Sequence, residues 1–237
     1  MSIASRIGVA TAIAAAALAP VAAGCGGDND VATGQDTLTT EAVESDRGGE
    51  LLGLAAQAFA SGDLSGAPEL TEALRTGEVK PWDNASPAMS PTLLPDDRVL
   101  AWNWAYREAP IRRGDVVAFT PTRSAQRFCG GPPAVFIKRV VGLPGDRVIA
   151  TRREVRVNGR PQVVKGAAAP GYSMSWPKLG PGQLVLLGDD RPNSCDSHHF
   201  GSQPASLILG KIVGIYFPVD RAGVLRRQGG SAPIPGS

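Results

Sequence analysis

Length, composition and charge limit what the chain can be. Its 237 residues suffice for one domain of roughly 150 residues with extensions. The 29 glycines and 20 prolines favour a turn-rich β architecture. The formal net charge is only +2, and there is no basic stripe interleaved with aromatic residues, so nucleic-acid binding is not expected.

Residues 1–24 are predicted to be a signal peptide. Arg6 supplies a positive charge ahead of the apolar run from Gly8 to Ala23. That run is shorter than the ~20 residues that span a bilayer. The small residues before Cys25 resemble a lipobox, which predicts lipidation of Cys25, although Ala22 stands where a larger aliphatic residue is usual. The alternative is an ordinary secretory signal, and both interpretations place the mature protein outside the cytoplasm.

The next two segments are predicted to be a flexible linker, 25–48, and a short helical spacer, 49–80. The linker is polar and rich in Gly, Asp and Thr. In the spacer, apolar residues recur at helical spacing from Glu50 to Ala60. A second short helix is expected from Pro68 to Arg75, ended by Gly77. We expect this pair to pack on the main domain.

Alternation with period two begins at Asn84 and predicts the main domain, 84–225. The Asn158-Gly159 pair is a strong two-residue turn signal. The tail, 226–237, is rich in Gly, Pro and Ser and is expected to be loose. The expected strands are 98–106, 116–119, 134–141, 147–151, 154–157, 183–187 and 208–217.

A segment of small residues and prolines, Ser86-Pro-Ala-Met-Ser-Pro-Thr-Leu93, opens the main domain. Its two prolines fix two φ angles and remove two amide donors, which predicts a rigid extended loop. In an extended backbone the alternating residues Ser86, Ala88 and Ser90 would point to one side.

Lys138 is unusual because it lies inside an apolar strand, on the same face as Phe136 and Val140. Loss of hydration disfavours the charged amine and lowers its pKa. A neutral amine can take a proton from a serine hydroxyl and so activate it as a nucleophile. Taken alone, however, the residues favour a lysine that snorkels at a sheet edge.

Besides Cys25, the chain has two cysteines, Cys129 and Cys195. In an oxidising compartment they are predicted to pair, and the alternative is two free thiols. No cluster of metal ligands is evident, and the His198-His199 pair is interpreted as solvated. No metal or other cofactor is therefore expected.

Three ordered motifs resemble those of the bacterial signal peptidase I family. Ser86–Leu93 resembles the nucleophile loop, Lys138–Asp146 the lysine segment, and Gly188–Ser197 the Gly-Asp-Asn-Arg block. The resemblance runs from about 86 to 217. It implies an all-β fold of antiparallel coiled sheets around a peptide groove, preceded here by a short helical N-terminal extension, and a site without metal or cofactor.

The resemblance also implies roles for individual residues. Lys138 would be the general base, and Ser86 together with the backbone amide of residue 88 would stabilise the oxyanion. Ser194 would orient Lys138. Asp196 would pair with an arginine, for which Arg139 is the candidate, although His198 replaces the arginine that the family has nearby.

One departure concerns the nucleophile itself, because Ala88 stands where the family has serine. No acyl-enzyme can form on alanine, and loss of a nucleophile typically costs about six orders of magnitude in turnover. Ser86 and Ser90 would each be displaced by roughly 6.6 Å in an extended strand, too far to substitute. The sequence does not distinguish natural inactivation from a deliberate knockout.

Two functions follow from the resemblance. The first is a serine endopeptidase of the signal peptidase I type, which cleaves signal peptides from exported preproteins after small residues and is inactive as written. The second is a catalytically dead protein that binds or regulates such peptides at the extracytoplasmic membrane face. In both, the partners are exported preproteins or signal-peptide segments and, through a lipid anchor on Cys25, the membrane surface.

Overall fold

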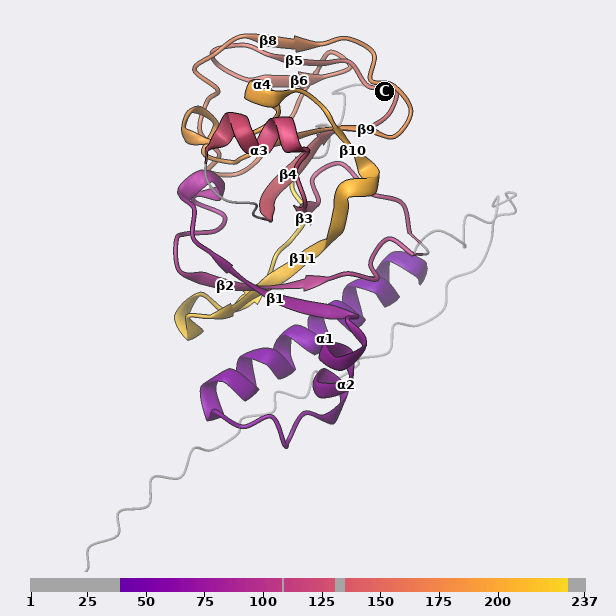
Figure 1. Cartoon of the computed structure of the whole chain (residues 1–237), viewed down its shortest axis with the longest axis vertical. Coiled ribbons are helices and arrows are strands. Elements are labelled where there is room, and N and C mark those ends of the chain that lie inside the picture. Colours follow the sequence, from indigo (N-terminus) through magenta and orange to yellow (C-terminus); the bar gives the residue numbers. More distant parts are fainter. Residues whose placement is uncertain (1–38, 108, 131–134, 230–237) are drawn as a thin grey trace, which may run out of the picture. The chain divides into compact units, whose positions relative to one another are not determined.

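The structure, a computed structural model, describes residues 39–107, 109–130 and 135–229, without the side chains of residues 39–46 (Figure 1). The predicted signal peptide, Cys25, most of the predicted linker and the end of the tail lie outside the described residues. No helix among the described residues is long and apolar enough to cross a membrane.

Two helices precede the sheet, α1 (Thr39–Ser61) and α2 (Pro68–Thr76). The first begins well before the expected start at 49, so the linker was predicted too long. Gly77 ends α2 in the left-handed conformation, with φ 74°, and its N–H donates to the carbonyl of Leu74. This is the stop that the sequence predicted, because glycine takes a positive φ without steric penalty.

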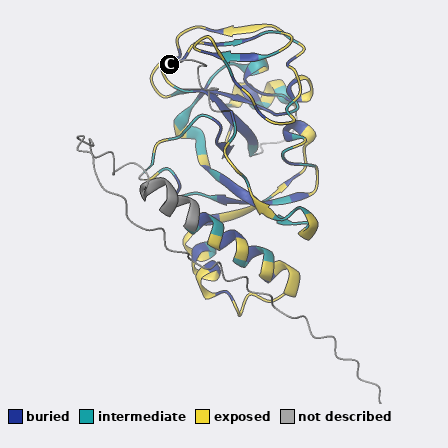
Figure 2. Cartoon of the chain, turned by 180° about the vertical axis from the view of Figure 1, so that it is seen from behind, coloured by how far each residue is buried: buried dark blue, intermediate teal, exposed yellow. Residues whose placement is uncertain are grey.

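The helical pair packs on one face of the larger sheet, as expected. Leu51 and Leu52 of α1 and Leu70 of α2 are buried in one cluster with Leu100 and Val213 of the sheet. In Figure 2 the larger sheet is mostly dark blue, whereas the coloured part of α1 alternates between buried and exposed colours. The helices therefore extend the core of the domain.

All strand pairs within residues 39–107, 109–130 and 135–229 are antiparallel, which confirms the predicted fold class. The larger sheet has the order β1-β2-β11-β3-β4-β9-β10, with β12 paired to β11, and the smaller has the order β7-β6-β5-β8. The strands of the larger sheet are β1 (Val79–Asn84), β2 (Asp97–Trp102), β3 (Val116–Phe119), β4 (Phe136–Gly142), β9 (Gln183–Leu187), β10 (Gln203–Pro204), β11 (Ile208–Phe217) and β12 (Gly223–Val224). Those of the smaller sheet are β5 (Val148–Ala150), β6 (Val155–Val157), β7 (Arg160–Pro161) and β8 (Met174–Trp176).

Short helices lie in the connections between strands. The two α-helical ones are α3 (Arg123–Cys129), which the sequence analysis did not predict, and α4 (Ser197–Phe200). The 3₁₀ turns are η1 (Pro87–Met89), η2 (Arg191–Asn193), η3 (Ala205–Leu207) and η4 (Val219–Arg221).

The segment Ser86–Leu93 is not extended throughout, so that prediction is wrong. Pro87–Met89 forms the turn η1, and Ser86 caps it by accepting a hydrogen bond from the Ala88 N–H at 3.2 Å. A 3₁₀ turn has three residues per turn, so alternate side chains do not share one side. The continuous extended backbone on which a shared side for Ser86, Ala88 and Ser90 was predicted is therefore absent.

Candidate active site

A cavity of about 490 Å³ brings the sequence motifs together. Its walls come from the end of β1, the turn η1, the strand β4 and the segment after η2. Of the predicted site residues, Ser86, Ala88, Lys138 and both cysteines line it, whereas Ser194 and Asp196 lie behind this lining. The described residues contain no group of three or more His, Cys, Asp or Glu side chains that could hold a metal ion.

Lys138 carries a buried amine on β4. The residue is 5% exposed, and Nζ has no hydrogen-bond partner within the described part of the chain. Burial lowers the pKa of Lys138 from 10.5 to about 8, against the opposing attraction of Asp196 and Asp189. An amine with this pKa is partly neutral near physiological pH, which a general base requires.

Ala88 contributes a methyl group and backbone atoms to the same cavity. It is 4% exposed, and its carbonyl accepts a hydrogen bond from the N–H of Asp190 at 3.1 Å. The two predicted oxyanion donors, the Ser86 hydroxyl and the Ala88 amide, are bonded to each other. Since the hydroxyl acts there as acceptor, its own proton stays available for donation into the cavity.

Ser194 is packed directly behind η1. It is 1% exposed, and its Oγ has no hydrogen-bond partner among the described residues, so the expected bond to Lys138 is not present. Ser194 and Ala88 can both lie close to residue 188 because it is glycine. An added Cβ at Gly188 would collide with the Ser194 hydroxyl and with the Ala88 carbonyl oxygen. An unpartnered hydroxyl at this depth is a group that a bound ligand or a reoriented lysine can satisfy.

The predicted ion pair between Asp196 and Arg139 is wrong. Arg139 instead binds Asp189 in a bidentate pair, with N–O distances of 2.8 and 2.6 Å. Asp196 accepts from the backbone N–H of Gly188 at 2.8 Å, and it pairs with Nδ1 of His198 at 2.9 Å. His198 thus serves as the side-chain partner of Asp196.

The Arg139–Asp189 pair joins all three motifs. Asp189 also accepts a hydrogen bond from the Thr92 hydroxyl at 2.5 Å, which fastens the segment after η1. The arginine further donates to the carbonyl of Gly114 at 2.8 Å. Both charged residues are almost completely buried, and β4 and β9 pair beside them. These contacts fix Lys138 relative to the turn that carries Ala88.

A disulfide joins Cys129 at the end of α3 to Cys195 after η2, with a Cα–Cα distance of 5.8 Å. Both cysteines line the cavity. The bond therefore ties one wall of the cavity to the segment that carries Ser194.

Together, the fold and the cavity define an all-β domain in which a buried lysine, Lys138, shares one cavity with Ser86 and Ala88. The sequence model of the family described as "Signal peptidase, peptidase S26" matches residues 70–217. Because this match covers more than half of the chain, the chain belongs to that family.

Two relatives named signal peptidase I support the assignment by their sequences. The signal peptidase I of Leptolyngbya laminosa is 38% identical over 141 residues, which are 59% of this chain and 70% of the relative. A probable signal peptidase I-2 of Synechocystis is 38% identical over 143 residues, covering 59% of this chain and 64% of the relative. A crystal structure of a signal peptidase I from Enterococcus faecalis covers 44% of this chain and 97% of its own, at 23% identity and a TM-score of 0.35.

Proposed function

We propose that this chain carries a site of the signal peptidase I type for the small-residue end of signal peptides. We further propose that the site binds these peptides without cleaving them, because residue 88 is alanine. The observation that carries the proposal is the buried Lys138 amine, which shares one cavity with Ala88 and has no hydrogen-bond partner among the described residues.

For peptide cleavage, the proposed site lacks one oxygen atom, the hydroxyl oxygen of a serine at position 88. A serine at position 88 would place a hydroxyl in the same cavity as Lys138 Nζ. The neutral amine would accept the hydroxyl proton while the oxygen attacked the peptide carbonyl, and the Ser86 hydroxyl would donate to the resulting oxyanion. With alanine, no side-chain atom at position 88 can form the acyl bond, so the other groups can only bind.

The geometry does not favour Ser86 or Ser90 as a nucleophile in place of residue 88. Ser90 is not among the residues that line the cavity, and its hydroxyl lies 3.5 Å from the carbonyl oxygen of Leu93. Among the described residues that line the cavity, only Ser86 has a hydroxyl group, and its oxygen already accepts from the Ala88 amide.

We place this binding at the extracytoplasmic face of the membrane, with exported preproteins or their signal segments as partners. The support is the apolar amino terminus and the lipobox-like residues before Cys25. Lipidation of Cys25 predicts that metabolic labelling with a radioactive fatty acid marks the full chain and does not mark a Cys25→Ser variant.

The test of the proposed function is cleavage of a preprotein whose signal peptide ends in Ala-x-Ala. The full chain is compared with Ala88→Ser and with the double variant Ala88→Ser/Lys138→Ala. We expect cleavage by Ala88→Ser alone, and binding of the uncleaved preprotein by the unaltered chain. Cleavage by the unaltered chain would overturn the proposal, as would an Ala88→Ser variant that neither cleaves nor binds.

A further inference from the structure

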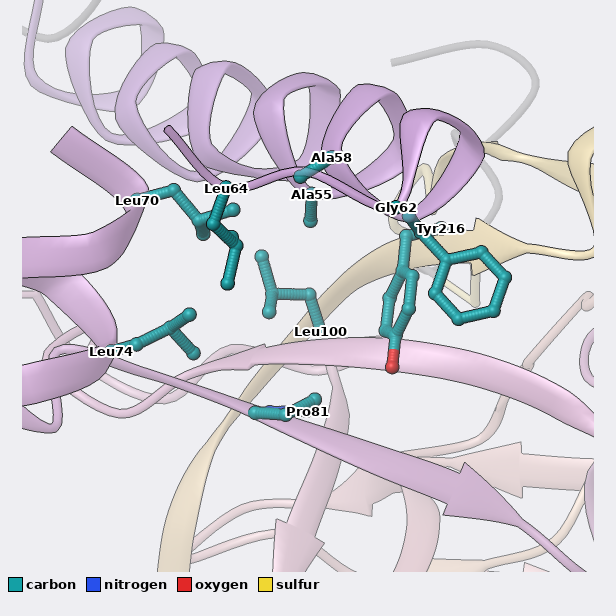
Figure 3. A pocket seen from close by; sticks show the side chains of 10 residues that line it. Ala55, Ala58, Gly62, Leu64, Leu70, Leu74, Pro81, Leu100 and Tyr216 are labelled. Atoms are coloured by element: carbon teal, nitrogen blue, oxygen red, sulfur yellow. The ribbon is translucent and has the colours of Figure 1, made fainter. Parts of the chain in front are cut away.

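A second cavity, of about 340 Å³, lies between the helical pair and the larger sheet. Figure 3 shows Leu64, Leu70 and Leu100 directed into it, with Tyr216 at one side. Of the described residues in the lining, only Tyr216 has a polar side-chain group, its hydroxyl. The rim is open to solvent, since Phe59 is 37% exposed and Leu64 is 49% exposed. We refer to this space as the apolar cavity.

Half of the lining comes from a part of the chain that the family match leaves out. The match begins at residue 70, whereas one wall of the apolar cavity is built from α1 and the loop after it. The lining residues in this part are Ala55, Ala58, Phe59, Gly62 and Leu64. The apolar cavity therefore depends on the helical extension of this chain.

The apolar cavity adjoins the candidate active site along β1. Pro81 lines the apolar cavity, and Asp83 lines the candidate site, so roughly 6.6 Å of one strand separates them. Arg98 spans both rims, because it pairs with Asp83 at 3.3 Å and lies 4.9 Å from the ring centroid of Phe59. The two rims are therefore next to each other on the molecule.

The strand between the two cavities is suited to hold a peptide. Within the described structure β1 pairs only with β2, so it is an edge strand to which an extended peptide can add. Its two faces differ: Val79 packs with the helical pair, whereas Trp82 packs in the cluster that contains Met89. A peptide added to this edge would direct alternate side chains toward the two cavities.

A β ladder with such a peptide would end at Pro81. Proline has no backbone N–H to donate to an added strand, and it is tolerated in β1 because β1 is an edge strand. A peptide that starts at the candidate site and follows β1 would leave the ladder where Pro81 forms part of the apolar cavity.

We infer that the apolar cavity binds the apolar core of a signal peptide whose small-residue end occupies the candidate site. The inference rests on the proposed function. A signal peptide places an apolar run of about 7–15 residues directly before its small-residue cleavage site, which matches an apolar cavity next to the candidate site. The volume is more than twice the ~150 Å³ that suffices for benzene, so the cavity can take more than one aliphatic side chain.

The test measures the affinity of the full chain for three fluorescent peptides. The first has two lysines, a core of about eight Leu and Ala residues and an Ala-Gln-Ala end. The second has serines in the core, and the third keeps the apolar core but ends in Lys-Gln-Lys. Burial of one or more leucine side chains predicts that the first peptide binds at least about tenfold tighter than the second.

Two variants test whether the apolar core of the peptide binds in the apolar cavity. Leu64→Ser removes an exposed apolar side chain from the rim, and Ala58→Phe fills the cavity from α1. Each is expected to abolish the advantage of the apolar core and to leave the affinity for the serine-core peptide unchanged. The matched control is Val163→Ser, at a residue that is 63% exposed and lines neither cavity.

The outcomes separate this inference from the proposed function. Equal affinity for the first and second peptides overturns the inference and leaves the proposed function standing. If the Leu64→Ser and Ala58→Phe variants still bind the first peptide more tightly than the second, the inference is also overturned, because the apolar core of the peptide then binds elsewhere. If the third peptide binds as tightly as the first, the apolar cavity binds apolar chains without help from the candidate site. That result also overturns the inference. If no peptide binds, both proposals fail.

Discussion

At the scale of single residues, the candidate site contains the buried amine of Lys138 in the same cavity as Ala88. Lys138 lies in the core of the sheet with its ammonium group almost completely desolvated. Burial of a charge without a hydrogen-bonded partner is unfavourable, and burial alone does not produce catalysis. The lysine should therefore lower the stability of the protein, which can be measured without any substrate.

We predict that Lys138→Met stabilises the protein below pH 8. The unfolded chain has a lysine pKa near 10.5, and the folded chain has a pKa of about 8, so between these values the unfolded state binds more protons. The stability of the unaltered protein should therefore rise from pH 8 to 10.5, and the full penalty, about 3 kcal/mol, should apply below pH 8.

Urea denaturation at pH 6.5 and pH 10 checks this prediction. The gap between Lys138→Met and the unaltered protein should be large at the lower pH and small at the higher one. Lys165→Met is the control, because Lys165 is exposed and its variant should show no such pH-dependent gap. A gap that is absent at pH 6.5, or that grows with pH, would contradict the assigned burial of the Lys138 amine.

A second residue-scale prediction concerns the Arg139–Asp189 pair. Asp189→Asn leaves a buried guanidinium without its charge partner, which typically costs about 3–5 kcal/mol. The exposed pair of Arg75 with Glu72 provides the control, because solvent screens this pair and Glu72→Gln should leave the urea midpoint nearly unchanged. Urea midpoints measure both variants. Equal, small decreases in the urea midpoint of both variants would show that the buried pair does not stabilise the packing of β4 against η1.

At the scale of elements, the sequence predicted best the strands whose apolar pattern is strong. Strands β3, β9 and β11 have the bounds that were expected, because apolar residues dominate each of them and turn signals flank them. Strand β1 was missed because its sequence, Val-Lys-Pro-Trp-Asp-Asn, has a proline and three polar residues. It is a strand because β2 pairs with it, which a local pattern does not reveal.

In the candidate site, too, the local sequence did not reveal which residues pair in three dimensions. The motifs placed Ser86, Ala88 and Lys138 in one cavity, but the sequence did not identify the partner of Arg139. Asp189, Asp190 and Asp196 lie close together in the chain and all carry carboxylates. Only the three-dimensional path after β9 brings Asp189 to the arginine and turns Asp196 toward His198.

The element-scale prediction concerns the disulfide that joins α3 to the segment carrying Ser194. The bonded cysteines are 66 residues apart, and the loop-entropy model gives roughly 4 kcal/mol for a loop of that length. Reduction should lower the melting temperature and speed amide exchange between Asn193 and Ser197. A Cys129→Ser/Cys195→Ser variant should not respond to the reductant. An unchanged melting temperature of the unaltered protein under reduction would count against the bond.

At the scale of the whole molecule, the helical extension and the β domain share one core. The family match begins at residue 70, yet Leu51 of α1 is fully buried against the sheet. At Gly214 of β11, an added Cβ would collide with the side chain of Leu52, so helix and sheet approach closely. We therefore expect one cooperative unfolding transition for residues 39–229.

The variant Leu51→Ala tests this expectation. Removal of a fully buried leucine side chain typically costs about 2–5 kcal/mol, since it combines lost apolar burial with a cavity. If the core is shared, helix content followed by circular dichroism and sheet packing followed by tryptophan fluorescence should shift together to lower denaturant. Gln57→Ala, at an exposed position of α1, should leave both transitions in place. Loss of the helical signal ahead of the fluorescence signal would show that α1 unfolds separately, and the apolar cavity that it covers would then open without unfolding of the β domain.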